Sequence, residues 1–126
     1  MADTAFRIIS LNCHGFNIGI EAYLSKLCDS CDIILLQETW LSDITCSRLQ
    51  NISNEFMVYH SSAMEDKLGN GILCGRPFGG TAILVRKSLD IHCNQVLTNN
   101  PRITSVSLTG INNTDIIFFQ CLYAVV

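Results

Sequence analysis

Two short apolar segments, each ending in a polar residue and separated by a helical pattern, limit the folds open to this chain. Residues 8–12 are Ile-Ile-Ser-Leu-Asn and residues 33–38 are Ile-Ile-Leu-Leu-Gln-Glu. Runs of this composition and length predict β-strands. Between them, Asn17 can cap a helix, and apolar residues recur at helical spacing from Ile20 to Cys31. The order strand, helix, strand predicts two parallel strands joined by a helical crossover.

Asn12 and Glu38 are the candidate site residues of this unit, because the carboxyl ends of parallel strands lie at one rim of a sheet. An amide oxygen and a carboxylate suit a hard cation such as Mg²⁺. Glu38 could instead be a solvated carboxylate, and Asn12 a turn residue before Gly15. A charge that follows four apolar residues must be paired, coordinated or exposed, and its sequence context favours the site.

The remainder of the chain has the pattern of a β-rich fold with one further helix. Ser42 and Asp43 predict the start of a short helix that ends near Gln50. The apolar run at 33–36 predicts a strand covered on both faces. Residues 62–79 predict a long polar loop, and Asn112-Asn113 predicts a hairpin turn. Further strands are predicted at 56–61, 80–85, 91–97, 103–109 and 114–122.

Composition narrows the class of protein. A chain of 126 residues makes one domain at most, and 48% hydrophobic with 15% charged residues excludes a disordered chain. No apolar run reaches the roughly 18 residues of a membrane span, and the N-terminus does not resemble a secretory signal. We therefore expect no membrane partner. Seven scattered cysteines predict a reduced intracellular compartment, nuclear or cytoplasmic. The formal charge of -3 argues against binding nucleic acid by charge alone.

Other reactive residues have structural interpretations beside functional ones. Cys28 and Cys31 form a Cys-x-x-Cys pair, but both lie on the apolar stripe of the helix, which favours burial over redox or zinc chemistry. His14 lies near the rim and could touch phosphate, although isolated histidines are more often structural. Trp40 is expected in the core, with stacking on a base as the alternative. The central region with Lys67, Arg76, Arg86 and Lys87 is the one plausible face for a polyanion. Arg76, Arg86 and Lys87 are expected to form an ordinary solvated face, which near the rim could attract a polyanion.

Two segments carry a family resemblance. Residues 10–16, Ser-Leu-Asn-Cys-His-Gly-Phe, and residues 36–41, Leu-Gln-Glu-Thr-Trp-Leu, resemble the endonuclease/exonuclease/phosphatase superfamily. Three weaker signals follow in the family's order at 79–84, 102–103 and 122–124. The sequence of residues 36–41, together with Gly-Gly-Thr-Ala at 79–82, is most similar to that of retrotransposon-type endonucleases.

The resemblance implies the α/β (α+β) class and a four-layer α/β/β/α sandwich of the deoxyribonuclease I-like type. It implies a hydrolase, a nuclease that cleaves DNA with Mg²⁺, which Mn²⁺ can replace. Glu38 matches the metal-ligating glutamate, and Asn12 matches the asparagine that supports the metal and the attacking water. Tyr123 matches a tyrosine that contacts the scissile phosphate. Where the family continues with Pro-Asn, this chain continues Ala124-Val125-Val126.

The family's later Gly-Asp-x-Asn and Ser-Asp-His elements have no counterpart in these residues. We therefore expect residues 1–126 to be the N-terminal part of such a domain, truncated and inactive or nearly so. One alternative is a non-catalytic remnant or interaction module that self-associates through exposed strand edges. Another is a phosphatase that acts on small phosphoesters or lipids, since one superfamily serves several substrates.

Overall fold

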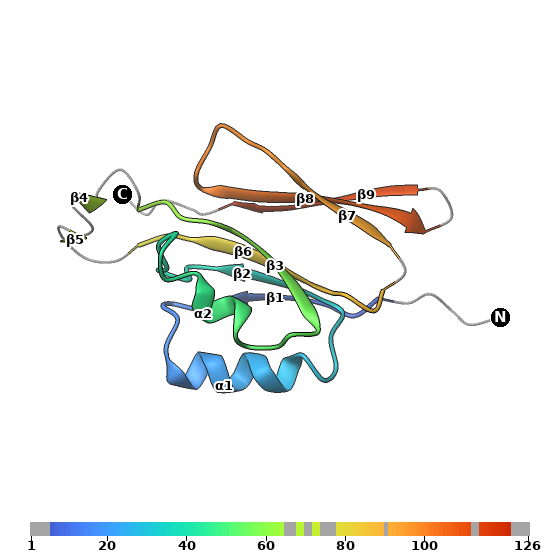
Figure 1. Ribbon diagram of the computed structural model, residues 1–126, viewed down its shortest axis with the longest axis horizontal. Helices are drawn as coiled ribbons and strands as arrows, with labels where there is room; N and C mark the ends of the chain where they lie inside the picture. Colours follow the sequence, from blue (N-terminus) through green and yellow to red (C-terminus); the bar gives the residue numbers. More distant parts are fainter. Residues whose placement is uncertain are drawn as a thin grey trace.

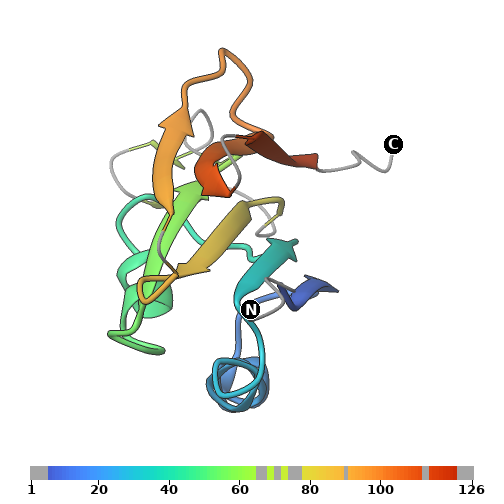
Figure 2. The same ribbon diagram turned by 90° about the vertical axis from the view of Figure 1, so that its right-hand side faces the viewer.

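Two β-sheets pack face to face, and helices cover the outer face of one of them (Figure 1). The computed structural model describes residues 6–64, 68–69, 72–73, 78–89, 91–111 and 114–121. Turned by 90°, the helices, the four-stranded sheet and the three-stranded sheet follow one another as three layers (Figure 2). The described chain is therefore an α+β protein whose two larger sheets pack together. The four-stranded sheet has the order β1-β2-β6-β3, formed by Ile8–Asn12, Ile33–Gln37, Thr81–Arg86 and Phe56–Ser61. The three-stranded sheet has the order β7-β8-β9, formed by His92–Val96, Ile103–Ile111 and Thr114–Cys121.

The β1-α1-β2 unit forms as the sequence predicts. Asn17 caps α1 (Ile18–Leu27), with its side chain accepting a hydrogen bond from the Ile20 backbone N–H at 3.0 Å. β1 and β2 are parallel, and Asn12 pairs with Gln37 at the end of the ladder. Because α1 connects them over one face of the sheet, both strands finish at the same end (Figure 1). We call this end the rim and the opposite end the base.

Strand β2 has apolar cover on both of its faces, as its uninterrupted apolar run predicts. Ile34 and Leu36 belong to the core beneath the helices, together with Leu24 of α1. Ile33 belongs to the second core, between the two sheets, where it lies with Val106 of β8. The two sheets therefore form a sandwich, and β2 contributes to both cores.

The other element predictions differ from the structure mainly at their boundaries. The short helix α2 spans only Ser47–Gln50, because Ser42 and Thr45 hydrogen-bond each other and hold the preceding residues in turns. Part of the predicted loop at 62–79 forms the two-residue strands β4 (Leu68–Gly69) and β5 (Ile72–Leu73). The predicted hairpin turn at 112–113 lies outside the described residues. None of the helices in the described ranges is long and apolar enough to cross a membrane.

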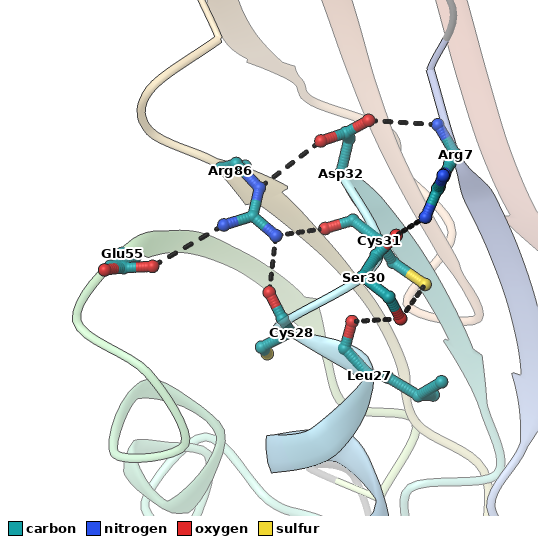
Figure 3. Close-up of polar contacts among 8 residues, drawn as sticks. All are labelled: Arg7, Leu27, Cys28, Ser30, Cys31, Asp32, Glu55 and Arg86. Carbon is teal, nitrogen blue, oxygen red and sulfur yellow. Dashed lines mark hydrogen bonds and ion pairs between the residues drawn. The ribbon is translucent and has the colours of Figure 1, made fainter.

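At the base, Arg86 gathers charges and carbonyl groups from three segments (Figure 3). Its guanidinium lies 3.3 Å from Asp32 Oδ1 and 3.5 Å from Glu55 Oε2. It also donates to the carbonyl oxygens of Cys28 and Cys31, at the end of α1. The prediction that Arg86 belongs to a solvated face near the rim is wrong, because its side chain is 18% exposed and lies at the opposite end. Lys67 and Arg76 lie outside the described residues.

Candidate metal site at the sheet rim

Asn12 and Glu38 lie at the rim, as predicted from the parallel strands. The ladder between β1 and β2 continues past both residues, with Cys13 N–H donating to Gln37 O at 2.8 Å and Gly15 N–H donating to Glu38 O at 2.8 Å. Adjacent strands lie about 4.8 Å apart. Asn12 is the last residue of β1 and pairs with Gln37, so Glu38 follows the neighbouring strand one residue further along.

The backbone after β2 turns through a left-handed conformation that favours glycine, although no glycine is present. Glu38 and Trp40 both have φ 58°, and His14 on the neighbouring strand end has φ 48°. Such a conformation costs a residue with a side chain about 1 to 2 kcal/mol, so the surroundings must impose it. Here two backbone hydrogen bonds hold the turn from opposite sides. Trp40 N–H donates to Gly79 O at 2.8 Å, and Phe16 N–H donates to Thr39 O at 2.9 Å.

Two glycines make room for this turn. Gly15 has φ 96°, and a Cβ there would collide with the six-membered ring of Trp40. Gly80 has φ 88°, and a Cβ there would collide with the Thr39 hydroxyl oxygen. Thr39 is fully buried between these segments. The Gly-Gly sequence before β6 thus has a physical reason: it lets the left-handed turn pack against the β6 entrance.

The Glu38 carboxylate has one polar contact among the described residues. Trp40 Nε1–H donates to Glu38 Oε2 at 3.1 Å, and no ion pair to Glu38 forms within the described ranges. Asn12 Oδ1 accepts a hydrogen bond from His14 N–H at 3.0 Å, which closes a turn after β1. Glu38 Oε1 and the second lone pair of Asn12 Oδ1 remain available for a ligand.

A row of polar side chains crosses both sheets just inside the rim. In the four-stranded sheet, Asn12 pairs with Gln37, Gln37 with Thr81, and Thr81 with Ser61. The facing row of the other sheet is Thr104 paired with Gln120. Hydrogen bonds join the rows: Thr81 Oγ1 to Thr104 Oγ1 at 2.7 Å, Gln37 Nε2 to Gln120 Oε1 at 3.4 Å, and Ser61 Oγ to Ile103 O at 3.1 Å. We call the five residues inside the rim, one from each of five strands, the polar row: Gln37, Ser61, Thr81, Thr104 and Gln120.

Sequence reasoning did not find the polar row. The signal available was the identity of the residues at the rim ends of strands: Gln37, Ser61, Thr81 and Thr104 are polar residues at or next to the end of a strand. Their common level became visible only with the register between the strands. The row separates the apolar core between the sheets from the ligand-facing rim.

The residues present fit a small divalent cation. Mg²⁺ prefers oxygen donors, keeps several of its waters, and is commonly held by one or two carboxylates together with substrate phosphate oxygens. Glu38 offers one uncommitted carboxylate oxygen and Asn12 one amide oxygen. Within the described ranges, no group of three or more His, Cys, Asp or Glu side chains gathers to form a metal site. A cation at the rim would therefore retain waters or bind phosphate oxygens.

The remaining candidate residues have mixed outcomes. Tyr123 lies outside the described residues. Trp40 is half-buried beside Glu38, and its ring lies 4.9 Å from that of His14, so the prediction of a plain core residue is wrong. Cys28 and Cys31 are buried, as expected. Next to Asn12, burial raises the pKa of the Cys13 thiol to about 11, so this thiol stays protonated at neutral pH.

No family model matches the chain, and no curated protein matches it. The site is therefore defined by its own geometry: an acidic and an amide side chain at adjacent strand ends, a constrained turn, and no cationic partner for Glu38 in the described part of the chain.

Proposed function

We propose that this chain carries the metal-binding part of a Mg²⁺-dependent phosphodiesterase of the endonuclease type, whose substrate in the complete enzyme is DNA. Its two sheets and helical layer would then be part of a four-layer, deoxyribonuclease I-like sandwich. The observation that carries the proposal is the Glu38 carboxylate, which follows β2 one residue beyond Gln37, the strand partner of Asn12, and has no cationic partner among the described residues. Mn²⁺ would replace Mg²⁺ at the same oxygens.

The chemistry of phosphodiester cleavage divides into two parts. When bound, the metal stabilises the negative charge on the phosphoryl oxygens. Glu38 and Asn12 are the residues that would hold the cation, and Asn12 would also support the attacking water. Activation of that water is a separate task, and a positioned acid or base typically contributes about 10²- to 10⁴-fold to the rate. The two motifs that perform this task in the resembling superfamily have no counterpart in the sequence, so residues 1–126 alone should bind the metal but cleave slowly or not at all. Tyr123 is proposed to contact the scissile phosphate.

Metal binding by the purified chain tests the first part. Isothermal titration with Mg²⁺ or Mn²⁺ should show one site that is lost in Glu38→Ala and weakened in Asn12→Ala. Asp29→Ala is the matched control, because Asp29 is an exposed carboxylate that follows α1 near the base. Equal binding by wild type and Glu38→Ala would overturn the proposal.

Substrate assays test the second part. Supercoiled plasmid with Mg²⁺ should be nicked slowly at most, and any nicking should disappear in Glu38→Ala. Robust cleavage by the wild-type chain would refute the expected inactivity. Release of inorganic phosphate from inositol phosphates, with no nicking of plasmid, would instead identify a phosphatase that uses the same rim.

A second candidate function is self-association, and the outer face of the β7-β8-β9 sheet favours it. Ile117 and Phe119 of β9 point outward and are 52% and 63% exposed. Val96 and Leu97, at the end of β7, are also exposed, and Val96 and Phe119 flank Ser105 from opposite sides. β9 is an edge strand in the described sheet. An apolar face next to an open edge favours pairing with a second copy.

Sedimentation velocity distinguishes the two functions. Self-association predicts dimers or larger species that dissociate in Phe119→Asp. Ile44→Asp is the matched control, because Ile44 is equally apolar and exposed but lies in the turn before α2. A stable wild-type monomer at high concentration would exclude this function.

A further inference from the structure

Trp40 has a role at the rim that neither its sequence position nor the family resemblance assigns. We propose that Trp40 is a positioning residue for Glu38: its indole N–H holds one carboxylate oxygen so that the other is presented to the metal. The inference rests on the proposed metal-binding function. It starts from the 3.1 Å hydrogen bond between Trp40 Nε1 and Glu38 Oε2, which is the only polar contact of this carboxylate within the described ranges.

The chemical nature of this donor matters. An Arg or Lys partner would neutralise the carboxylate and compete with a cation, whereas an indole N–H is neutral and donates a single hydrogen bond. The hydrogen bond therefore fixes one oxygen of Glu38 without placing a competing cation beside the carboxylate. Fixing Oε2 also restricts rotation of the carboxylate, and a restricted side chain loses less conformational freedom when a metal binds.

The indole is itself held from several directions. Its ring packs over Gly15, where a side chain would collide with it, and it meets the His14 ring at 4.9 Å with an interplanar angle of 57°. The Trp40 backbone N–H donates to Gly79 O at 2.8 Å, and the residue has φ 58°. The two residues that would carry the hydrogen bond, Glu38 and Trp40, are both in the left-handed conformation on either side of the buried Thr39. The turn places both side chains on the same side, which explains why a costly conformation is kept.

A purely structural role for Trp40 makes different predictions. Packing over Gly15 requires an aromatic ring, whereas positioning of Glu38 requires the N–H group. Trp40→Phe keeps a ring and removes the donor. Groups that orient metal ligands typically contribute about 10- to 100-fold to metal affinity. We therefore expect Trp40→Phe to bind Mn²⁺ about 10-fold more weakly than wild type, measured by the electron paramagnetic resonance of free Mn²⁺. Tyr23→Phe is the matched control, since Tyr23 is an exposed aromatic residue on α1.

A second measurement uses the fact that the chain contains a single tryptophan. The indole N–H of a ¹⁵N-labelled sample gives one resonance, and titration with Mg²⁺ should shift it in a saturable way. Glu38→Gln should abolish this shift. Urea unfolding of Trp40→Phe checks that the fold is retained. If this variant does not fold, the wild-type titration decides: an indole resonance that does not move while Mg²⁺ saturates the site would overturn the inference.

The outcomes separate this inference from the proposed function. If wild type binds Mn²⁺ through Glu38 and folded Trp40→Phe binds it with the same affinity, the positioning role is wrong and the metal site stands. If Glu38→Ala binds Mn²⁺ as well as wild type does, the metal site and the positioning role are both wrong. A 10-fold weaker affinity in Trp40→Phe, with unchanged binding in Tyr23→Phe, supports both.

Discussion

The carboxylates at the two ends of the four-stranded sheet have different kinds of partner: a cationic side chain at the base and a neutral one at the rim. At the base, Asp32 and Glu55 both lie within ion-pair distance of Arg86 (Figure 3). The Arg86 guanidinium also stacks over the Phe56 ring, 4.7 Å from its centroid. At the rim, Glu38 receives one hydrogen bond from a neutral indole. The two carboxylates at the base therefore share one cationic side chain, whereas Glu38 has no cationic partner within the described residues.

This difference indicates that the base contributes to the stability of the fold, whereas the rim is arranged for binding. The base connects the end of α1, the start of β2 and the end of β6, so its ion pairs and carbonyl contacts hold three elements together. At the rim, the chain accepts left-handed φ values at His14, Glu38 and Trp40. Strain of this kind persists where the arrangement of a site requires it. Three predictions use this contrast, and each could break it.

The largest expected effect is at the base. Arg86→Met keeps much of the volume of the side chain but leaves Asp32, which is 24% exposed, without its cation, and two carbonyl oxygens without their donor. Breaking a buried pair from one side typically costs 3 to 5 kcal/mol. Because Arg86 is partly exposed, we expect the free energy of unfolding to fall by about 3 kcal/mol, measured by urea denaturation.

Arg48→Met is the matched control for this prediction. Arg48 also forms an ion pair, to Glu21 at 3.8 Å, and stacks on an aromatic ring, that of Phe16. Both partners of the pair are more exposed than Arg86, so the loss should be below about 1 kcal/mol. Similar losses in the two variants would show that the base contributes no more stability than an ordinary surface pair.

The base and rim also show what the sequence can predict. Strand identity, the α1 cap and the shared rim of Asn12 and Glu38 were predictable, because they depend on local patterns and on the parallel crossover. The apolar cover on both faces of β2 was predictable from its uninterrupted apolar run. The role of Arg86 was not predictable. Its partners lie 31 and 54 residues away in the chain, and no local pattern records such a contact.

The finer structure of the rim was also beyond the sequence. The left-handed φ of Glu38 and Trp40 results from hydrogen bonds to the Gly79-Gly80 segment, about 40 residues further along. Two adjacent glycines indicate that the backbone can adopt left-handed conformations, but they do not indicate which segment packs against them. The polar row depends on the register of five strands at once, so single-strand patterns could not reveal it.

The second prediction compares buried thiols at the two ends. Cys13 lies at the rim and Cys28 near the base, and burial raises the pKa of each to about 11, although Arg86 acts in the opposite direction on Cys28. An unfolded chain releases these protons near pH 9, so between pH 9 and pH 11 the unfolded state binds fewer protons than the folded state. Stability then falls as pH rises.

At pH 10, each thiol should account for a loss of about 1.4 kcal/mol relative to pH 7, the value of one pKa unit. Urea denaturation at both pH values measures the loss in wild type, Cys13→Ala and Cys28→Ala. Each variant should lose about 1 kcal/mol less than wild type over this interval, whatever its stability at pH 7. Cys46→Ala serves as the control because Cys46 is only half-buried. An identical pH dependence in all four proteins would contradict the prediction.

The third prediction concerns the polar row. Each hydroxyl can donate one hydrogen bond, and Thr104 Oγ1 lies 2.7 Å from Thr81 Oγ1 and 3.1 Å from Thr81 O. One arrangement satisfies both contacts: Thr104 donates to the Thr81 carbonyl, and Thr81 donates to the Thr104 oxygen. Thr81→Val then removes one hydrogen bond and leaves the other, whereas Thr104→Val removes both and leaves a buried hydroxyl without an acceptor. Leaving a buried polar group unpaired costs about 1 to 3 kcal/mol.

We therefore expect Thr81→Val to cost about 1 kcal/mol and Thr104→Val about 2 kcal/mol, while the double variant costs less than the sum of the two. Thr109→Val is the control on the same strand β8, where its hydroxyl is half-buried. Urea denaturation measures all four variants. Equal costs for the two single variants would show that the hydroxyls donate the other way, or share their protons. Because both side chains are fully enclosed between the sheets, none of these variants should change metal binding at Glu38, and a loss of binding would show that the polar row and the rim act as one unit.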